Sequence, residues 1–372
     1  MRNFRNYEEL DMTFKSGINV LLGENGQGKT NLVESICIAA RGLSFRPGSA
    51  NNWLGNVNKL SGQIAARLDK RAGLSYEVKV NFEGKRKSHF IDNKRASRAS
   101  LMKEFSCVLF SPESLSAIKG SPEMRRELID DLLVSHLPGA ADLIGQYERI
   151  LLSRGRLLRE VKKGWIKADS DFYRVLDSME PRFIERATLL TSARIRALHE
   201  IQPELQAKMR MLFPRSPVDI SVDYLISGES ALNWERSRIE TTFAESLKKL
   251  RVAEIESGGN LVGPQKHDIQ FRYQGEDARF FCSQGQQRGL ILSFKLAQIM
   301  YHYKVHQEYP VLLMDDVLSE LDQERRTNLI GALTRLDSQI LVTATDLSFS
   351  MNFGSSELSV YQVINGKIVE AS

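Results

Sequence analysis

The residues from Gly23 to Thr30 have the types and spacing of a phosphate-binding loop. The segment Gly-Glu-Asn-Gly-Gln-Gly-Lys-Thr fits the pattern G-x-x-x-x-G-K-[S/T]. Its glycines let backbone N–H groups approach phosphate oxygens, and a following helix adds its positive N-terminal end. In such a loop the Lys29 amine binds the β- and γ-phosphates, and the Thr30 hydroxyl is a ligand of Mg²⁺. The alternative is an ordinary glycine turn that carries an exposed lysine.

Two adjacent carboxylates, Asp315 and Asp316, follow an apolar run. Carboxylates at the end of a buried strand are costly unless they serve a metal or a water molecule. With a phosphate loop elsewhere in the chain, we expect Asp315 to face Mg²⁺. Asp316 is then the candidate general base, or the group that orients the attacking water. A helix cap or a turn pair is the alternative.

Apolar patterns indicate the elements that would position these residues. Runs of strand length occur at Ile18–Leu22, Cys107–Phe110, Pro310–Met314 and Gln339–Ala344. Helices are predicted after the glycine loop and near residues 284–306. Strands that alternate with helices indicate a parallel α/β core. Residues 60–92 alternate with period two, which predicts antiparallel hairpins with a turn at Asn81–Gly84.

The middle of the chain has a helical composition rich in Arg, Leu, Glu and Lys. Prolines at positions 138, 181, 203 and 214 are expected to interrupt it, because a proline inside a helix costs roughly 3 kcal/mol. Several shorter helices are therefore predicted. We divide the chain into an N-terminal lobe (residues 1–110), a helical arm (111–256) and a C-terminal lobe (257–372).

The charge distribution permits a nucleic-acid partner without requiring one. The chain carries 51 Lys/Arg and 46 Asp/Glu, a net charge of +5. Residues 1–110 carry 18 Lys/Arg against 10 Asp/Glu, while residues 111–256 carry 23 against 23. Much of the excess lies between Arg67 and Lys103. The candidate DNA-binding residues are Lys85, Arg86, Lys87, Lys94 and Arg95. A solvated protein face is the alternative.

The remaining composition favours a cytoplasmic protein. No apolar run approaches the roughly 20 residues of a spanning helix, and the N-terminus has no apolar secretory segment. The 3 cysteines are far apart and show no C-x-x-C spacing. A disulfide scaffold and a cysteine zinc site are therefore disfavoured.

A short segment, Ser283-Gln284-Gly285-Gln286, precedes the predicted helix near residues 284–306. Alone it indicates no more than a helix cap. In ATP-binding-cassette proteins, however, a Ser-x-Gly-Gln signature lies at this distance before the acidic pair. Asp316–Asp322 then corresponds to their D-loop, and Thr345 stands where a switch histidine is often found. Glu113 stands in the place of their glutamine loop.

The chain resembles the RecF family, bacterial DNA replication and repair proteins among the SMC-like cassette ATPases. The segments that carry the resemblance are Asn3–Tyr7, Gly23–Thr30, Arg41–Arg46, Phe110–Glu113, Gly120–Arg126, Gly263–Asp268, Ser283–Arg288 and Asp315–Arg326. They run nearly from end to end. The resemblance implies an α/β fold: an ABC/SMC-type P-loop ATPase head with an antiparallel β subdomain and an inserted helical arm.

The resemblance also implies ATP and Mg²⁺ as cofactors. Residues expected to contact ATP are Gly23, Glu24, Asn25, Gly26, Gln27, Gly28, Lys29, Thr30, Asn31, Arg5, Asn6, Ser283, Gly285 and Gln286. Thr30 and Asp315 would bind Mg²⁺, and Asp316 and Lys29 would act in hydrolysis. Arg46 would contact phosphate or DNA. ATP would join two chains head to tail, because the phosphate loop of one would face the signature of the other. Asp316 stands where many cassette ATPases have Glu, which suggests slow hydrolysis.

The partners implied are double-stranded DNA and single/double-strand junctions, bound with little sequence preference, and RecR acting with RecO. The function would be recombinational repair and replication-fork maintenance. Two alternatives remain: a transporter-associated ATPase, which leaves the helical arm unexplained, and an ATP-binding clamp with negligible turnover. His267 lies in a matching segment but is expected to be a solvent-exposed loop residue.

Overall fold

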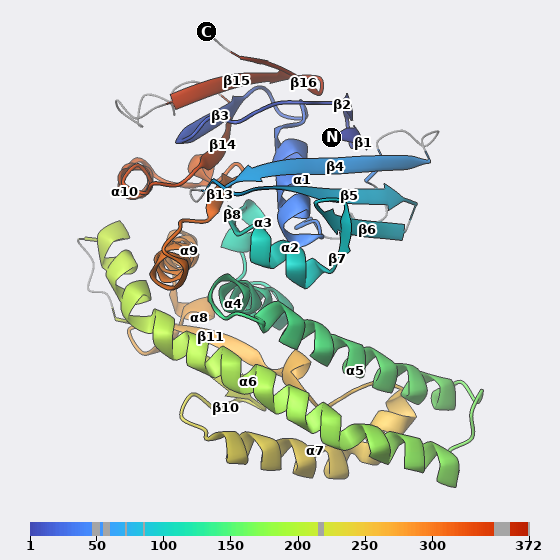
Figure 1. Cartoon of the computed structure of the whole chain (residues 1–372). Helices are drawn as coiled ribbons and strands as arrows, with labels where there is room; N and C mark the ends of the chain where they lie inside the picture. Colours follow the sequence, from blue (N-terminus) through green and yellow to red (C-terminus); the bar gives the residue numbers. More distant parts are fainter. Residues whose placement is uncertain are drawn as a thin grey trace. The chain divides into compact units, whose positions relative to one another are not determined.

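The structure is a computed structural model that forms two compact units (Figure 1). It describes residues 1–46, 53–54, 60–70, 73–84, 86–214, 219–345 and 358–370. The first unit comprises residues 1–116, 208–216 and 288–372, and the second comprises 117–207 and 217–287. Residues 257–287, placed in the C-terminal lobe from the sequence, thus fall in the second unit. The three-domain division itself stays a prediction.

A six-stranded sheet in the first unit has the order β16-β15-β3-β14-β13-β8. Its strands are β3 (Ile18–Leu22), β8 (Cys107–Phe110), β13 (Val311–Met314), β14 (Ile340–Ala344), β15 (Leu358–Ile364) and β16 (Lys367–Glu370). All neighbours are parallel except β15 and β16. Every residue of β8 and β14 is buried, as expected of strands covered on both faces. The predicted parallel core and its four strands are confirmed.

A second sheet in this unit is antiparallel and has the order β2-β1-β4-β5-β6-β7. Its strands are β1 (Arg2–Phe4), β2 (Tyr7–Glu9), β4 (Ser61–Asp69), β5 (Ser75–Glu83), β6 (Arg86–Ile91) and β7 (Lys94–Ala96). The predicted hairpins are confirmed, but the predicted turn at Asn81–Gly84 begins too early. Asn81 and Phe82 still pair with β6, because the apolar alternation continues through Phe82.

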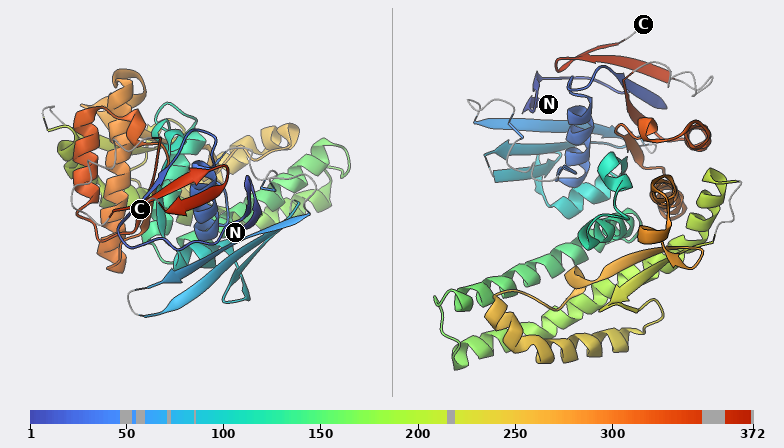
Figure 2. Two further views of the ribbon diagram at one scale, coloured as in Figure 1. Left: turned by 90° about the horizontal axis from the view of Figure 1, so that it is seen from above. Right: turned by 180° about the vertical axis from the view of Figure 1, so that it is seen from behind.

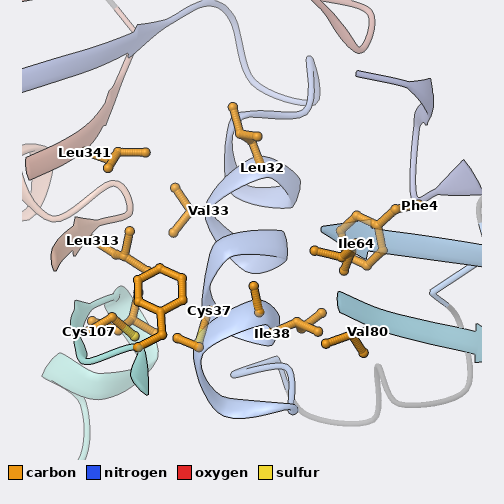
Figure 3. Packing of buried hydrophobic residues seen from close by; sticks show 14 of the residues in the cluster. Phe4, Leu32, Val33, Cys37, Ile38, Ile64, Val80, Cys107, Leu313 and Leu341 are labelled. Atoms are coloured by element: carbon orange, nitrogen blue, oxygen red, sulfur yellow. The ribbon is translucent and has the colours of Figure 1, made fainter. Parts of the chain in front are cut away.

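Helix α1 (Lys29–Arg41) forms the core between these two sheets (Figure 3). Val33 lies on the side of Leu313 and Leu341, and Ile38 lies on the side of Ile64 and Val80. A helix that buries apolar residues on several sides is typical of a domain interior. Each such side chain contributes about 1.5–3 kcal/mol when fully buried. This packing therefore fixes the position of the start of α1, where the phosphate loop ends.

The first unit contains five further helical segments in the part of the chain that the structure describes. They are α2 (Arg98–Glu104), α3 (Pro112–Leu115), η3 (Leu318–Glu320), α10 (Gln323–Leu333) and α9 (Gln284–His306), of which residues 288–306 belong to this unit.

The second unit contains long helices and a small sheet. Its helices are α4 (Pro122–His136), α5 (Ala140–Lys162), α6 (Ser170–Leu212), α7 (Arg236–Ser257), η2 (Pro264–Lys266) and α8 (Ala278–Phe281). Its sheet has the order β10-β9-β11-β12, formed by β9 (Ile220–Ile226), β10 (Glu229–Ser230), β11 (Asp268–Tyr273) and β12 (Glu276–Asp277). Figures 1 and 2 show α5, α6 and α7 side by side, so the helical arm predicted from composition is present.

The prolines interrupt the arm less than predicted. Pro138 does lie between α4 and α5, and Pro214 follows α6. Pro181 and Pro203, however, lie inside the 43-residue helix α6, so the prediction of several shorter helices was wrong there. The long buried face of α6 explains the difference, because its fully buried side chains outweigh a penalty of roughly 3 kcal/mol for each proline. They include Phe183, Ala187, Leu190, Leu198, Ile201 and Leu205.

In the part of the chain that the structure describes, no helix combines the length and apolar character needed to cross a membrane.

Candidate nucleotide-binding site

The predicted phosphate loop connects β3 to α1, as a phosphate-binding loop requires. Gly28 caps α1 with a φ of 116°, a left-handed conformation that favours glycine. A Cβ atom at Gly28 would lie 2.5 Å from Nδ2 of Asn6. A Cβ atom at Gly23 would collide with the backbone carbonyl of Val363. Neighbouring backbone and side chains therefore enclose the loop tightly, while Glu24, Asn25 and Gly26 at its crest are exposed.

The Lys29 side chain folds back over its own loop. Its Nζ donates to the carbonyl of Gly23 at 2.5 Å and to that of Glu24 at 2.8 Å. Burial lowers the pKa of Lys29, while Asp316 and Asp315 oppose this shift. A bound phosphate would replace two neutral acceptors with charged ones, which form stronger hydrogen bonds. The amine is thus held where the loop can present it to a phosphate.

The two predicted magnesium ligands are in direct contact. Thr30 Oγ1 donates to Asp315 Oδ1 at 2.9 Å, and Thr343 Oγ1 donates to the same oxygen at 3.1 Å. Asp315 is only 4% exposed. Burial raises the pKa of Asp315, and the two threonine hydrogen bonds lower it. A hydroxyl and a carboxylate oxygen are ligands that Mg²⁺ prefers, so the residues present fit this ion.

Asp316 is oriented differently from its neighbour. Its φ is 51°, and its N–H donates to Thr343 Oγ1 at 2.8 Å. Ser319 Oγ donates to Asp316 Oδ1 at 2.8 Å, and the Asp316 residue is exposed. The unusual backbone conformation separates the two carboxylates, one buried and one accessible to water. This separation suits a metal ligand and a group that acts on water.

A buried carboxylate, Glu34, organises the polar residues beside the loop. Arg5 donates to it from Nε at 3.1 Å and from Nη2 at 2.8 Å, and Ser44 Oγ donates at 2.5 Å. Arg46 Nη1 lies 3.5 Å from Glu34 and donates to Asn31 Oδ1 at 2.9 Å. Arg5 therefore has a carboxylate partner already, and its contact with phosphate stays a prediction. Glu34 was not among the predicted site residues, although an acid within the apolar pattern of α1 is a local signal of a buried polar contact.

Three of the residues predicted to contact ATP also brace the loop. Asn6 Nδ2 donates to the Gln27 carbonyl at 3.0 Å, and Asn31 Nδ2 donates to Asn6 Oδ1 at 2.8 Å. The N–H of Asn365 donates to Gln27 Oε1 at 2.6 Å. These side chains thus connect the loop to the β1–β2 turn and to the β15–β16 turn.

The signature segment forms a helix cap in the second unit. The N–H of Ser283 donates to Gln286 Oε1 at 2.8 Å, and the N–H of Gln286 donates to Ser283 Oγ at 3.3 Å. This reciprocal pair caps α9 while Ser283 stays exposed and Gly285 half-buried. The start of a capped helix can also bind a phosphate through its free N–H groups. The cap and the predicted phosphate contact are therefore compatible.

A series of ion pairs and hydrogen bonds connects this segment to the rest of the second unit. Asp268 accepts from Arg125 at 2.8 and 2.9 Å and from Arg279 Nη1 at 3.3 Å. Arg279 also donates to Asp277, whose side chain caps α8. Gln287 Nε2 then donates to the Ala278 carbonyl at 2.8 Å. The chain of contacts runs from α4 to the residues directly before Ser283, and spacing alone gave no indication of it.

His267 is buried, so the prediction of an exposed loop histidine was wrong. Its ring is stacked on that of Phe243, with centroids 5.5 Å apart, and Nδ1 lies 3.0 Å from the Tyr224 hydroxyl. It lies at the junction of η2 and β11, where α7 and β9 supply these partners. Burial lowers the pKa of His267 to about 3, assisted by the positive charges of Arg194 and Arg126.

The described members of the predicted DNA-binding cluster do not share one side of the antiparallel sheet. Lys85 lies outside the described residues. Lys87 pairs across the sheet with Phe82 on the core-facing side, and its Nζ lies 3.5 Å from the ring centre of the buried Trp53. The grouping was wrong because adjacent strand residues face opposite sides of a sheet. By the same register, Lys94 shares the core-facing side, while Arg86 and Arg95 occupy the outer side.

Comparison with known proteins shows the family of this chain. The chain matches the RecF/RecN/SMC N terminal domain family over residues 1–368. It is 33% identical over 370 residues to the DNA replication and repair protein RecF of Bacillus thuringiensis (strain Al Hakam), covering 99% of this chain and 96% of that protein. The chain belongs to the RecF family. The protein of the same description from Bacillus anthracis (strain CDC 684 / NRRL 3495) is equally similar, at 33% identity over the same shares.

Solved structures support the fold. The recombination mediator protein RecF–ATP of the RecFOR pathway superposes with a TM-score of 0.84 at 23% identity, over 100% of this chain and 96% of that one. The Smc head bound to the C-winged helix domain of ScpA gives a TM-score of 0.54 at 15% identity, over 100% and 95%. The ABC/SMC-type ATPase head is therefore the fold of this chain. The family match includes the helical arm, so a transporter-associated ATPase is not favoured.

Proposed function

We propose that the chain is an ATP-dependent DNA-binding protein of the cytoplasm, which acts in recombinational repair and replication-fork maintenance. One observation carries this proposal: Thr30 of the phosphate loop and Asp315 of the acidic pair share a hydrogen bond in a chain of the RecF family. These residues come from opposite ends of the sequence, and the parallel sheet joins them. RecR, acting with RecO, is the proposed protein partner.

The residues have separate roles in ATP binding and hydrolysis. Lys29 exchanges its loop carbonyls for the β- and γ-phosphates, and Thr30 and Asp315 hold Mg²⁺. Bound Mg²⁺ supplies positive charge that neutralises the phosphate oxygens. Asp316 accepts a proton from the attacking water or orients it. Its side chain is one methylene shorter than Glu and is held by Ser319, which favours slow hydrolysis.

A second copy of the chain completes the site in this proposal. Ser283 and the exposed start of α9 are available to a ligand from another molecule. ATP then joins two chains head to tail, each phosphate loop facing the signature of its partner, and hydrolysis stimulated by DNA releases them. A clamp with negligible turnover differs from this proposal only in rate. Single-turnover hydrolysis with and without DNA separates the two.

DNA contacts in the first unit are assigned to the outer side of the antiparallel sheet. Arg86 and Arg95 are exposed there, and Lys79 shares that side by register. Arginine and lysine contacts to phosphates position a protein on duplex or gapped DNA without reading its sequence. Binding with little sequence preference and strong salt dependence follows.

Sedimentation velocity tests the proposal with the wild type, Lys29→Met and a control, Lys103→Met, which removes an exposed lysine of α2. Each is measured with Mg²⁺ and a gapped duplex at fixed salt, with and without ATP. The wild type and the control should shift from monomer to a DNA-bound dimer when ATP is added, and Lys29→Met should not. A wild type that binds DNA as a monomer and ignores ATP would contradict the proposed switch.

A further inference from the structure

The end of α5 and the loop after it form a basic segment that the total charge conceals. Residues 149–167 contain 7 Lys/Arg and a single acid, Glu160, a net charge of +6. Residues 111–256 as a whole are neutral, with 23 of each sign. Arg154 is buried against Glu254, and Arg156 pairs with Glu160 at 2.8 Å. The other cations of the segment are exposed.

Helical spacing places several of these cations on one face. Arg149, Leu152, Arg156, Arg159 and Lys163 follow one another at intervals of three or four residues, which is one stripe of a helix. All five are exposed, and Leu152 is 64% exposed. With a rise of 1.5 Å per residue, the stripe is about 21 Å long. The opposite face of α5 is covered, since Tyr147, Arg154 and Leu158 are buried.

A tryptophan ends the stripe. Trp165 is 71% exposed, which is unusual for so large an apolar side chain. Its backbone is nevertheless fixed, because its N–H donates to the Glu160 carbonyl at 3.0 Å. Lys163 Nζ lies 4.5 Å from the centre of its ring. The indole is therefore presented to solvent by an ordered turn, beside a cation.

We propose that this surface, Arg149, Arg156, Arg159, Lys163 and Trp165, binds single-stranded DNA. The cations contact successive phosphates along α5, and the indole stacks on an unpaired base. This inference rests on the proposed DNA-binding function and adds a second site, on the arm. A duplex is less suitable, because its bases are already stacked on one another and cannot cover an indole. An acidic protein would satisfy the cations but leaves the ordered, exposed ring unexplained.

Stacking on an aromatic side chain contributes about 1–3 kcal/mol per base, so loss of Trp165 should weaken binding about tenfold. Each phosphate contact to a single strand contributes about 0.7 to the slope of log affinity against log salt. Removal of two cations should therefore reduce that slope by about 1.4. If only single-stranded DNA binds to the arm, these variants should bind a duplex of the same sequence with the affinity of the wild type.

The test uses the full-length chain and a labelled oligothymidine, with anisotropy and tryptophan fluorescence as readouts. Arg159→Ala/Lys163→Ala is compared with Lys248→Ala/Lys249→Ala, which removes the same charge from exposed positions of α7. The variant Trp165→Leu is measured with both readouts, beside the two double variants. We expect the first pair and Trp165→Leu to weaken oligothymidine binding about tenfold, with the control pair close to wild type. The oligonucleotide should quench the fluorescence of the wild type and not that of Trp165→Leu.

Other outcomes overturn the arm proposal without affecting the proposed ATP switch, which sedimentation measures separately. Equal weakening by both double variants would reduce the effect to net charge. Quenching that Trp165→Leu does not alter would remove the indole from the site. If poly-glutamate of matched charge competes as well as oligothymidine, the surface is a docking site for an acidic protein. If ATP does not cause dimerisation but oligothymidine still quenches the fluorescence of Trp165, the arm site is supported and the proposed ATP-dependent function is contradicted.

Discussion

The hydroxyl of Thr30 donates to the carboxylate of Asp315 at 2.9 Å, although 285 residues separate them in the chain. The strand order β3-β14-β13 explains the contact, because these strands are parallel and their carboxyl ends meet at one edge. Ligands of open parallel sheets bind outside this edge. Thr343, at the end of β14 between them, donates to the same carboxylate oxygen.

Replacement of Thr30 by valine should weaken Mg²⁺-dependent ATP binding about tenfold or more. The variant keeps the side-chain shape but removes a metal ligand and leaves Asp315 with one fewer donor; hydrogen bonds to charged groups contribute about 1.5–3 kcal/mol. Calorimetric titration with ATP checks this. Thr327→Val, on α10, is the matched control, since its hydroxyl bonds only within its own helix. Equal affinities for the two variants would remove Thr30 from the site.

The two aspartates should differ when each is changed to asparagine. Asp315→Asn should weaken Mg²⁺–ATP binding, because it removes the buried carboxylate that faces Thr30. Asp316→Asn should keep binding but slow single-turnover hydrolysis by about 10²–10⁴-fold, the range of a lost general base. Rapid-quench assays measure the second effect. If Asp316→Asn hydrolyses ATP at the wild-type rate, the water-activating role belongs to another residue.

The carboxylate of Asp268 should be needed to hold the signature segment in position, but not for ATP binding. Asp268→Asn leaves the almost fully buried Arg125 guanidinium without its carboxylate, a change that costs about 3–5 kcal/mol. We expect lower stability and a loss of ATP-dependent dimerisation, with ATP affinity unchanged. Urea unfolding and sedimentation measure these. Glu229→Gln, which breaks an exposed pair with Arg238, should change stability by about 0.5 kcal/mol or less. A dimer that forms normally in Asp268→Asn would show that this series of ion pairs and hydrogen bonds has no such role.

Acid should destabilise the second unit through His267. Its pKa is about 3 in the folded chain against an ordinary 6.5, so the unfolded chain binds the proton first as pH falls. Stability from this residue is complete above pH 6.5 and decreases toward pH 3. At pH 5 the loss is about 2 kcal/mol relative to pH 7. His267→Asn keeps an acceptor for Tyr224 and should show a correspondingly smaller difference in urea unfolding between the two pH values. An identical pH dependence in both proteins would contradict the prediction.

Opposite sides of the antiparallel sheet should contribute unequally to duplex DNA binding. Arg86→Ala/Arg95→Ala removes two outer cations and should weaken affinity and lower the salt slope by about 1.8. Lys87→Ala/Lys94→Ala removes the same charge from the core-facing side and should have little effect on binding. Fluorescence anisotropy at several salt concentrations compares them. Equal slopes for the two variants would exclude the outer side as the DNA surface.

Much of the parallel sheet could be predicted from the sequence, because four of its strands are compact, largely apolar runs. Ile18–Leu22 and Ile340–Ala344 are buried on both faces, so their composition alone indicates them. The phosphate loop and the acidic pair follow such runs directly. The residues that position the site were harder to find. The partners of Glu34 and the Arg125–Asp268 pair depend on contacts between distant segments, which no local pattern encodes.

The errors have physical causes of the same kind. Proline disfavours the interior of a helix, but the tertiary packing of α6 overrides this local preference at Pro181 and Pro203. His267 follows a Gly-Pro segment typical of an exposed loop, yet a ring from α7 and a hydroxyl from β9 cover it. Lys87 belongs to a basic run in the sequence, but strand alternation turns it away from Arg86. The pairing of β5 with β6 places Lys87 on the core-facing side, and this strand register could not be assigned before the structure.

Mixing two defective variants tests the central claim most directly, that Lys29 and Ser283 act on one ATP from different chains. Lys29→Met and Ser283→Arg should each fail to dimerise and to hydrolyse ATP alone. An equal mixture should recover ATP-dependent dimers and up to about half of the wild-type turnover per dimer, because one of the two sites in a mixed dimer is intact. Normal dimerisation by Ser283→Arg alone, or a mixture as inactive as its components, would contradict the shared site.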